Sequence, residues 1–130
     1  PYCHLEQVAL QELLPEFTKK GATLLTLSPQ LEPYARKWVE EDGVEYSVLL
    51  DLGLGVARDY GLTFELGAEL RSLYTERLKI DLSRFNGDQS WELPIPATCV
   101  IDTDGTVVYA SVHPDYTQRP EPSEILQAIP

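Results

Sequence analysis

The sequence predicts an α/β domain in which parallel strands are joined by crossover helices. Helical and strand patterns alternate through the first half of the chain, and this alternation is typical of parallel sheets with helical connections. In the second half, two short apolar runs flank a turn sequence at residues 102–105, which indicates an antiparallel hairpin. With 130 residues, of which 43% are hydrophobic, the chain can form its own core. We therefore expect a single domain over residues 1–130.

Apolar residues at helical spacing from Leu5 to Phe17 predict the first helix. Pro15 falls inside this pattern and should bend or restart the helix, because proline lacks the N–H group that the helical ladder needs. The last turn is basic and a glycine follows it, so the helix should end near Lys20.

The run at 22–27 is apolar and is bounded by turn residues, as expected for a strand that is buried on both faces. The same signals predict further helices over about 31–41, 56–60, 66–78 and 123–129, and strands over 47–50, 98–101 and 106–110. Ser123 is the expected N-cap of the last helix. Residues 63–92 have the pattern of an insertion made of one helix and one loop, under which Trp91 should pack.

The composition excludes several classes of partner. Ten basic and 21 acidic residues give a formal net charge of −11, which repels nucleic acid and anionic membrane surfaces. The chain has no methionine and begins with proline, so we expect it to be a fragment whose targeting signals cannot be assessed. Its two cysteines do not form the dense framework of a small secreted protein, which favours a reducing, cytoplasmic location.

The opening Pro1-Tyr2-Cys3 has the pattern of the second half of a Cys-Pro-Tyr-Cys redox motif whose first cysteine would precede Pro1. Proline is favoured at the first position of a helix, so the residue before Pro1 would be the N-cap. Unpaired N–H groups and the helix dipole favour a thiolate at that position. Cys3, one turn into the helix, could then close a disulfide with it.

These residues have other interpretations. Cys3 could be a small buried hydrophobic residue, and Cys99 lies in an apolar strand where a core position is expected. His4 would complete a haem attachment motif, but the helical context disfavours it. A zinc site from Cys3, His4, Cys99 and His113 lacks the paired spacing of such sites. We therefore expect no metal.

The order of elements resembles the thioredoxin fold, a central mixed sheet flanked by helices, with its N-terminal strand missing from this chain. Several segments are similar to the peroxiredoxin-like branch of the alkyl hydroperoxide reductase and thiol-specific antioxidant family. They are Cys3-His4-Leu5-Glu6, Ser28-Pro29-Gln30, Asp59-Tyr60-Gly61-Leu62, Asn86-Gly87-Asp88, residues 91–98, Val100-Ile101-Asp102, Asp104-Gly105, Tyr109-Ala110 and residues 115–119.

The resemblance implies a thiol-dependent peroxidase in which the cysteine before Pro1 is the nucleophile and Cys3 is its resolving partner. Pro96 matches a proline that is cis in related proteins and faces the dithiol. Arg119 could hold a peroxide or stabilise a thiolate if its loop folds back over the helix start. The other interpretation of Arg119 is a solvated loop residue.

The resemblance also implies partners. These are a hydroperoxide substrate and a thioredoxin-like or glutathione-linked reductant, with no cofactor, and a homodimer is left open. The 130 residues alone should be inactive, because they lack the nucleophile. Two alternatives stay open: a protein disulfide oxidoreductase, and a redox-inactive binding module with the same fold.

Overall fold

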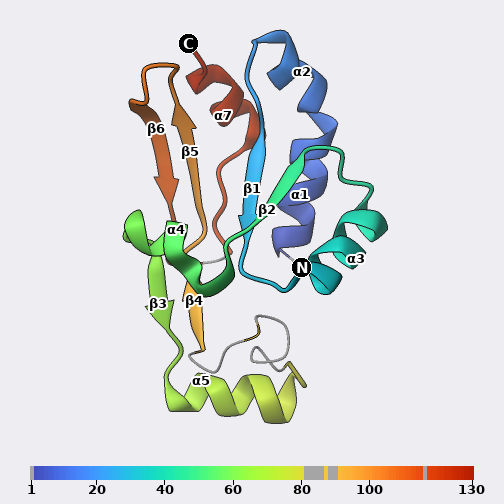
Figure 1. Ribbon diagram of the computed structural model, residues 1–130, viewed down its shortest axis with the longest axis vertical. Helices are drawn as coiled ribbons and strands as arrows, with labels where there is room; N and C mark the ends of the chain where they lie inside the picture. The colour runs from blue at the N-terminus through green and yellow to red at the C-terminus, as the bar shows by residue number, and fades with distance from the viewer. Residues whose placement is uncertain (1, 81–86, 88–90, 116) are drawn as a thin grey trace. The chain divides into compact units, whose positions relative to one another are not determined.

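A computed structural model describes residues 2–80, 87, 91–115 and 117–130 of the chain. Its helices and strands alternate from residue 25 to residue 72, while two helices open the chain and three strands follow one another over residues 92–112 (Figure 1). The elements are α1 (Tyr2–Glu12), α2 (Leu14–Lys19), β1 (Leu25–Ser28), α3 (Glu32–Asp42), β2 (Ser47–Leu50), the 3-10 turn η1 (Leu52–Leu54), α4 (Gly55–Asp59), β3 (Thr63–Glu65), α5 (Ala68–Ser72), the π-helical turn η2 (Leu73–Arg77), β4 (Glu92–Pro94), β5 (Ala97–Ile101), β6 (Val107–Val112) and α7 (Pro122–Ala128). No helix in the described part is both long and apolar enough to cross a bilayer.

Contacts divide the chain into two compact units. The first unit comprises Pro1–Thr26, Val39–Ser47 and Ile95–Pro130, and the second comprises Leu27–Trp38 and Val48–Pro94. Each unit is described by itself.

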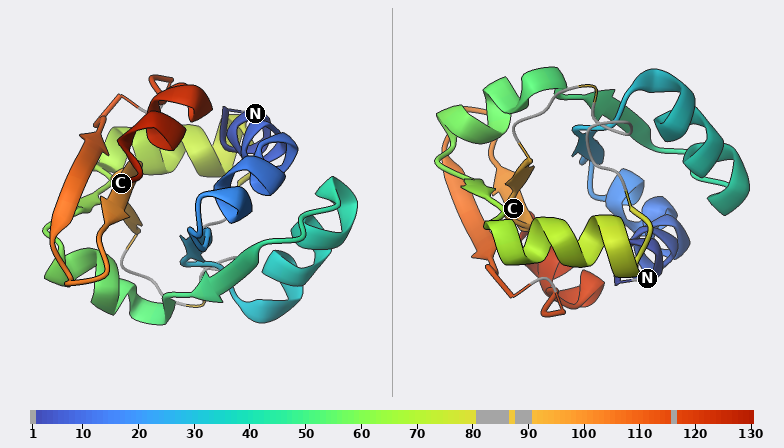
Figure 2. Two further views of the ribbon diagram at one scale, coloured as in Figure 1. Left: turned by 90° about the horizontal axis from the view of Figure 1, so that it is seen from above. Right: turned by 90° about the horizontal axis from the view of Figure 1, so that it is seen from below.

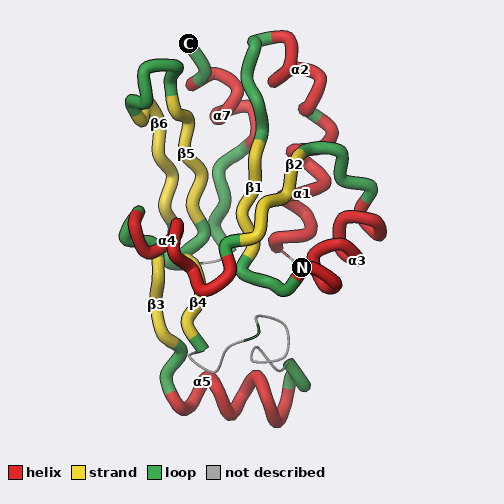
Figure 3. Tube along the Cα trace, in the orientation of Figure 1, coloured by secondary structure: helices red, strands yellow, loops and turns green. Residues whose placement is uncertain are grey.

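The first unit begins with two consecutive helices where one bent helix was expected. A short interruption at Leu13 separates α1 from α2 (Figure 3), and Pro15 lies in the first turn of α2. Proline is tolerated there because the first turn of a helix does not use its N–H group. The predicted restart at Pro15 and the predicted end near Lys20 are both confirmed.

The antiparallel hairpin of the first unit is confirmed as well. Strands β5 and β6 pair with Ala97 opposite Val112 and Cys99 opposite Ala110. Helix α7 contacts β6, as two views of the ribbon show (Figures 1 and 2). Buried side chains from α1, α2, α7 and the segment 39–47 form the core of this unit. They are Leu10, Phe17, Val44, Tyr46 and Ile125.

Helix α7 begins one residue earlier than predicted, and Ser123 is not its N-cap. The N-cap is Glu121, whose backbone is extended and whose side chain makes no capping hydrogen bond. Pro122 follows it in the first turn. The fixed φ of proline suits this turn, so Pro122 rather than a capping serine sets the start of the helix.

The described strands pair as three two-stranded sheets, β1–β2, β3–β4 and β5–β6. The expectation that β1 is buried on both faces is wrong, because Leu25 and Leu27 are exposed. Among the described strands β1 pairs only with β2, and no other strand continues the sheet at its second edge.

The second unit contains the predicted insertion, which has more regular structure than one helix and one loop. Strands β3 and β4 pair antiparallel, with Thr63 opposite Pro94 and Glu65 opposite Glu92, and they bracket α5 and η2. The sequence analysis missed both strands because each has only three residues. The expected turn at residues 86–88 lies outside the described residues except for its glycine.

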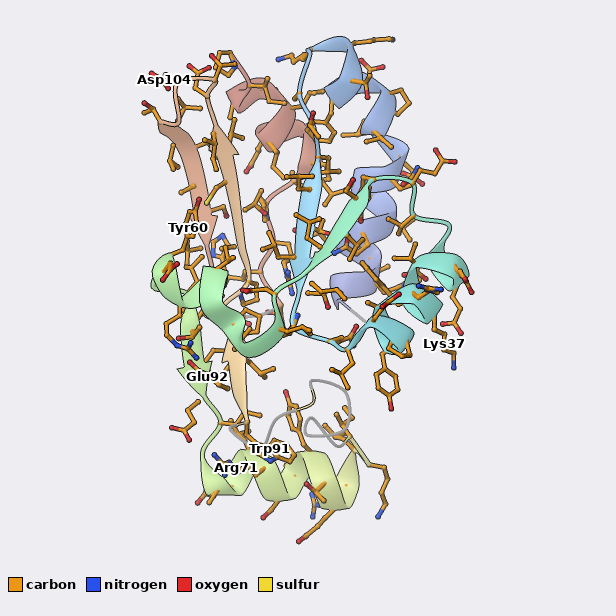
Figure 4. All side chains as sticks on the ribbon, in the orientation of Figure 1. Lys37, Tyr60, Arg71, Trp91, Glu92 and Asp104 are labelled. Carbon is orange, nitrogen blue, oxygen red and sulfur yellow. The ribbon has the colours of Figure 1, made fainter. Side chains whose placement is uncertain are left out.

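Aromatic packing and a capping carboxylate stabilise the second unit. Trp91 packs edge-on against Tyr74, with 6.5 Å between ring centroids, beside α5 in Figure 4. This contact places Trp91 against the inserted helix. The buried carboxylate of Asp51 accepts hydrogen bonds from the N–H groups of Val56 and Ala57, both at 2.9 Å. These bonds satisfy two of the otherwise unpaired donors in the first turn of α4.

Candidate functional site

The start of α1 carries the predicted redox position. Cys3 lies in the first turn of this helix, as expected; its side chain and all of Pro1 lie outside the described part of the structure. Residues three and four apart share one face of a helix. Glu6 and Gln7 therefore lie one turn after Cys3, on the same side of α1.

Arg119 forms an ion pair with Glu6 on this face of α1. Its Nη1 atom lies 2.7 Å from Oε2 of Glu6, and the two side chains are 17% and 11% exposed. The loop that follows β6 therefore contacts the second turn of α1. The interpretation of Arg119 as a solvated loop residue does not fit this burial.

The loop that carries Arg119 is held by its own hydrogen bonds. The carboxylate of Asp115 accepts one bond from the backbone N–H of Thr117 at 3.0 Å and one from its hydroxyl at 2.7 Å. These two bonds, the hydroxyl first, lower the pKa of Asp115. The N–H of Gln118 donates to the carbonyl oxygen of Asp115 at 3.0 Å. The turn before Arg119 is thus fixed independently of the ion pair.

Pro96 joins the same site, but its peptide bond is not the predicted cis bond. No peptide bond between described residues is cis, so the bond between Ile95 and Pro96 is trans. The carbonyl oxygen of Pro96 accepts a hydrogen bond of 3.1 Å from the N–H of His113. This bond extends the pairing of β5 and β6 by one residue beyond Ala97 and Val112. Pro96, with its trans peptide bond, directly precedes β5.

A shallow surface depression, referred to below as the pocket, lies where these segments meet. It is lined by side chains from α1, from the start of β5, from the end of β6 and from the following loop. The lining residues are Glu6, Pro96, Ala97, Thr98, Ser111, His113, Gln118, Arg119 and Pro120. All of them belong to the first unit. Two of the three predicted site residues, Pro96 and Arg119, therefore line one pocket one helical turn from the backbone of Cys3.

Two further contacts tie α1 to the segment 39–47. The Nδ1 atom of His4 lies 2.9 Å from the carboxylate of Asp42. The hydroxyl of Tyr46 donates a hydrogen bond to the side-chain oxygen of Gln7. Burial, followed by the negative charges of Glu6 and Asp42, raises the pKa of Tyr46, so its hydroxyl remains a donor.

Cys99, which was expected in the core, is a free thiol and is only half-buried. It stands in the middle of β5, opposite Ala110. The alternating register of the hairpin places Cys99 and Thr98 on opposite faces.

The chain is also similar in sequence to a known protein family. The sequence profile of the AhpC/TSA family matches residues 1–110 of the chain. The chain belongs to the AhpC/TSA family. The AhpC/TSA match contains Cys3, Glu6 and Pro96 but ends before Arg119. The position of Arg119 therefore rests on the structure alone.

A solved structure has a similar fold. It is the crystal structure of the peroxidoxin BcpB from Mycobacterium tuberculosis, with a TM-score of 0.71 and 19% sequence identity. The match covers 99% of this chain and 70% of the peroxidoxin chain. The mixed α/β, thioredoxin-like fold predicted for this AhpC/TSA protein is thereby confirmed. A comparison with curated proteins gave no match.

The sequence analysis missed Glu6, Asp42 and Tyr46 as parts of this region. Glu6 and Arg119 are 113 positions apart, and no spacing rule connects two residues at such a distance. The only signal near Glu6 was its position one turn after Cys3, and that position is equally typical of a solvated helix face.

Proposed function

We propose that this chain is the thioredoxin-like part of a thiol-dependent peroxidase that reduces hydroperoxides through a Cys-Pro-Tyr-Cys dithiol. Membership of the AhpC/TSA family supports this proposal. The observation that carries it is the guanidinium of Arg119, held by Glu6 one helical turn from Cys3. In this proposal a cysteine precedes Pro1 in the protein that carries the chain.

The first chemical step belongs to that preceding cysteine. Its thiolate attacks one oxygen of the hydroperoxide, the O–O bond breaks, and the cysteine becomes a sulfenic acid. The other oxygen leaves as an alkoxide or hydroxide and takes up a proton to give an alcohol or water. Arg119 serves this step, because a cation near the sulfur favours the thiolate and interacts with the negative charge on the departing oxygen.

Cys3 carries out the second step. Its thiolate attacks the sulfenic sulfur, the S–O bond breaks, and a disulfide forms with release of water. A thioredoxin-like or glutathione-linked dithiol then reduces this disulfide by thiol exchange and is itself oxidised. The cycle needs no metal or organic cofactor. Of the proposed dithiol, the 130 residues alone hold only Cys3, and they should not turn over peroxide.

The test compares peroxide reduction with disulfide reduction in a protein that includes the residue before Pro1. We expect consumption of hydrogen peroxide with a thioredoxin-type reductant, and slow reduction of insulin disulfides. The Cys3→Ser variant should lose turnover or depend on added small thiols. Insulin reduction without peroxide consumption would instead identify a disulfide oxidoreductase. A residue other than cysteine before Pro1 would contradict both enzymes and favour a binding module.

A further inference from the structure

One face of α1 carries three polar side chains at a spacing of three and four residues, and we call it the polar face. Its residues are His4, Gln7 and Gln11. Each of them bonds to the segment 42–46, at the end of α3 and before β2. His4 pairs with Asp42, and Gln7 accepts a hydrogen bond from Tyr46. The side-chain oxygen of Gln11 accepts a bond of 2.7 Å from the N–H of Glu45. Both partners of every contact belong to the first unit.

The segment 42–46 is itself tied to the last turn of α3. Gly43 has a φ of 63°, and the N–H of Val44 donates a hydrogen bond of 3.1 Å to the carbonyl oxygen of Val39. This bond and the left-handed glycine form the Schellman motif that commonly ends helices. Val44 and Tyr46 are buried. A movement of this segment therefore displaces two core side chains as well as its contacts with α1.

His4 and Asp42 link the first turn of α1 to this segment. The side chain of Asp42 is 7% exposed, whereas that of His4 is 56% exposed. An exposed imidazole gains little from such a contact. A buried carboxylate that loses its partner, however, keeps the full cost of its desolvation. Opening of the first turn of α1 therefore destabilises the segment 42–46 through Asp42.

We propose that α1 and the segment 42–46 open and close as one conformational unit, coupled through the polar face of α1. Hydrogen bonds are directional, so a rotation of α1, or a slide by one residue, breaks all three contacts together. The first turn of this helix contains Cys3. A partner that binds the exposed Gly43 and Glu45 therefore changes how often this turn is open, and the coupling acts equally in the reverse direction.

Native-state amide hydrogen exchange, followed by NMR on the protein that carries the chain, measures this coupling. Gln11→Ala removes the acceptor of the Glu45 N–H. Alanine is the best helix former, so a purely local effect would slow exchange in α1. We expect instead that exchange becomes about fivefold faster at Glu45 and at residues 6–8, whose amides bond to carbonyl oxygens of the first turn. The matched control is Glu12→Ala, at an exposed position of the same helix, which should accelerate neither.

A second variant tests the coupling from the first turn. His4→Ala leaves the carboxylate of Asp42 buried without this partner, so exchange at the amides of Val44 and Glu45 should become about fivefold faster or more. These amides lie in the segment, not in the substituted helix. Leu5→Ala, at the next position of the same turn, is the matched control because the side chain of Leu5 is 64% exposed. It should leave the segment unchanged.

The β5–β6 hairpin is the reference for unfolding of the whole protein. Its strands make none of these three contacts, so its amides should keep their exchange rates in both variants. The inference is contradicted if Gln11→Ala changes only the amide of Glu45, if His4→Ala leaves the segment 42–46 unchanged, or if the hairpin amides accelerate by the same factor. The measurement needs no peroxide turnover, so its outcome is independent of the proposed function.

Discussion

At the scale of single residues, Arg119 shows what a sequence can and cannot predict. Its role was predicted on the condition that its loop folds back over the start of α1. The structure pairs its guanidinium with Glu6, in the second turn of α1, and the role itself stays a prediction. Glu6 was not predicted as a site residue, because its ion pair depends on Arg119, which only the fold brings near. Pro96 was placed in the right region, but with the wrong peptide isomer.

Replacing Arg119 should separate catalysis from stability. Arg119→Met removes the cation and leaves the Glu6 carboxylate buried without this partner, so both kcat/KM for peroxide and Tm should fall. Adding Glu6→Gln in the same protein should restore most of the Tm but not the activity. Steady-state peroxide consumption and thermal unfolding measure the two effects. Recovery of activity in the double variant would contradict the role of the cation.

The hydroxyl of Tyr46 should contribute to stability in a pH-dependent way. Tyr46→Phe removes the hydrogen bond to Gln7 and should lower the free energy of unfolding by about 1 kcal/mol at neutral pH. Burial raises the pKa of Tyr46 above its ordinary value of 10.0. Its stabilising contribution is therefore fully present below pH 10.0 and is lost as the pH rises further. Urea unfolding at several alkaline pH values should show that the free energy of unfolding declines less with rising pH in the variant than in the unmodified protein. An equal decline in both proteins would contradict this role of Tyr46.

At the scale of elements, the strongest local signals gave the most accurate predictions. The break at Pro15 and the hairpin around residues 102–105 follow from backbone chemistry that acts within a few residues. Helix α7 begins at Pro122 for a similar local reason, although a serine cap was expected. Strands β3 and β4 were missed, because three residues give no readable alternation and their pairing depends on contacts across the insertion.

The hairpin turn should make a measurable acid-sensitive contribution. Asp104, at the tip of the hairpin in Figure 4, accepts a hydrogen bond of 2.9 Å from the N–H of Thr106. Hydrogen bonds from Thr106 lower the pKa of Asp104 below its ordinary value of 3.8. This contribution is present above that value and is lost as the pH falls through the lowered pKa. Asp104→Asn should unfold with a weaker dependence on pH in acid, as followed by circular dichroism. If unfolding of the variant depended on acidic pH as strongly as that of the unmodified protein, the contribution of Asp104 would be contradicted.

At the scale of the whole molecule, the family and the fold class were predicted correctly. The order of elements and the scattered motifs were specific as a set, although each was weak alone. The sheet was harder to predict, because strand partners are chosen by contacts that are distant in the sequence. The described strands form three separate pairs. The candidate site nevertheless lies within one compact unit, so its geometry does not depend on the second unit.

The most direct test of the proposed function is to map the product of a single oxidation. A protein that includes the residue before Pro1 is treated with stoichiometric hydrogen peroxide, quenched, alkylated and digested for peptide mass spectrometry. We predict a disulfide between Cys3 and a cysteine preceding Pro1, formed much more slowly in the Arg119→Met variant. Recovery of Cys3 as a fully alkylated thiol, with no disulfide at the start of α1, would contradict the proposed redox site.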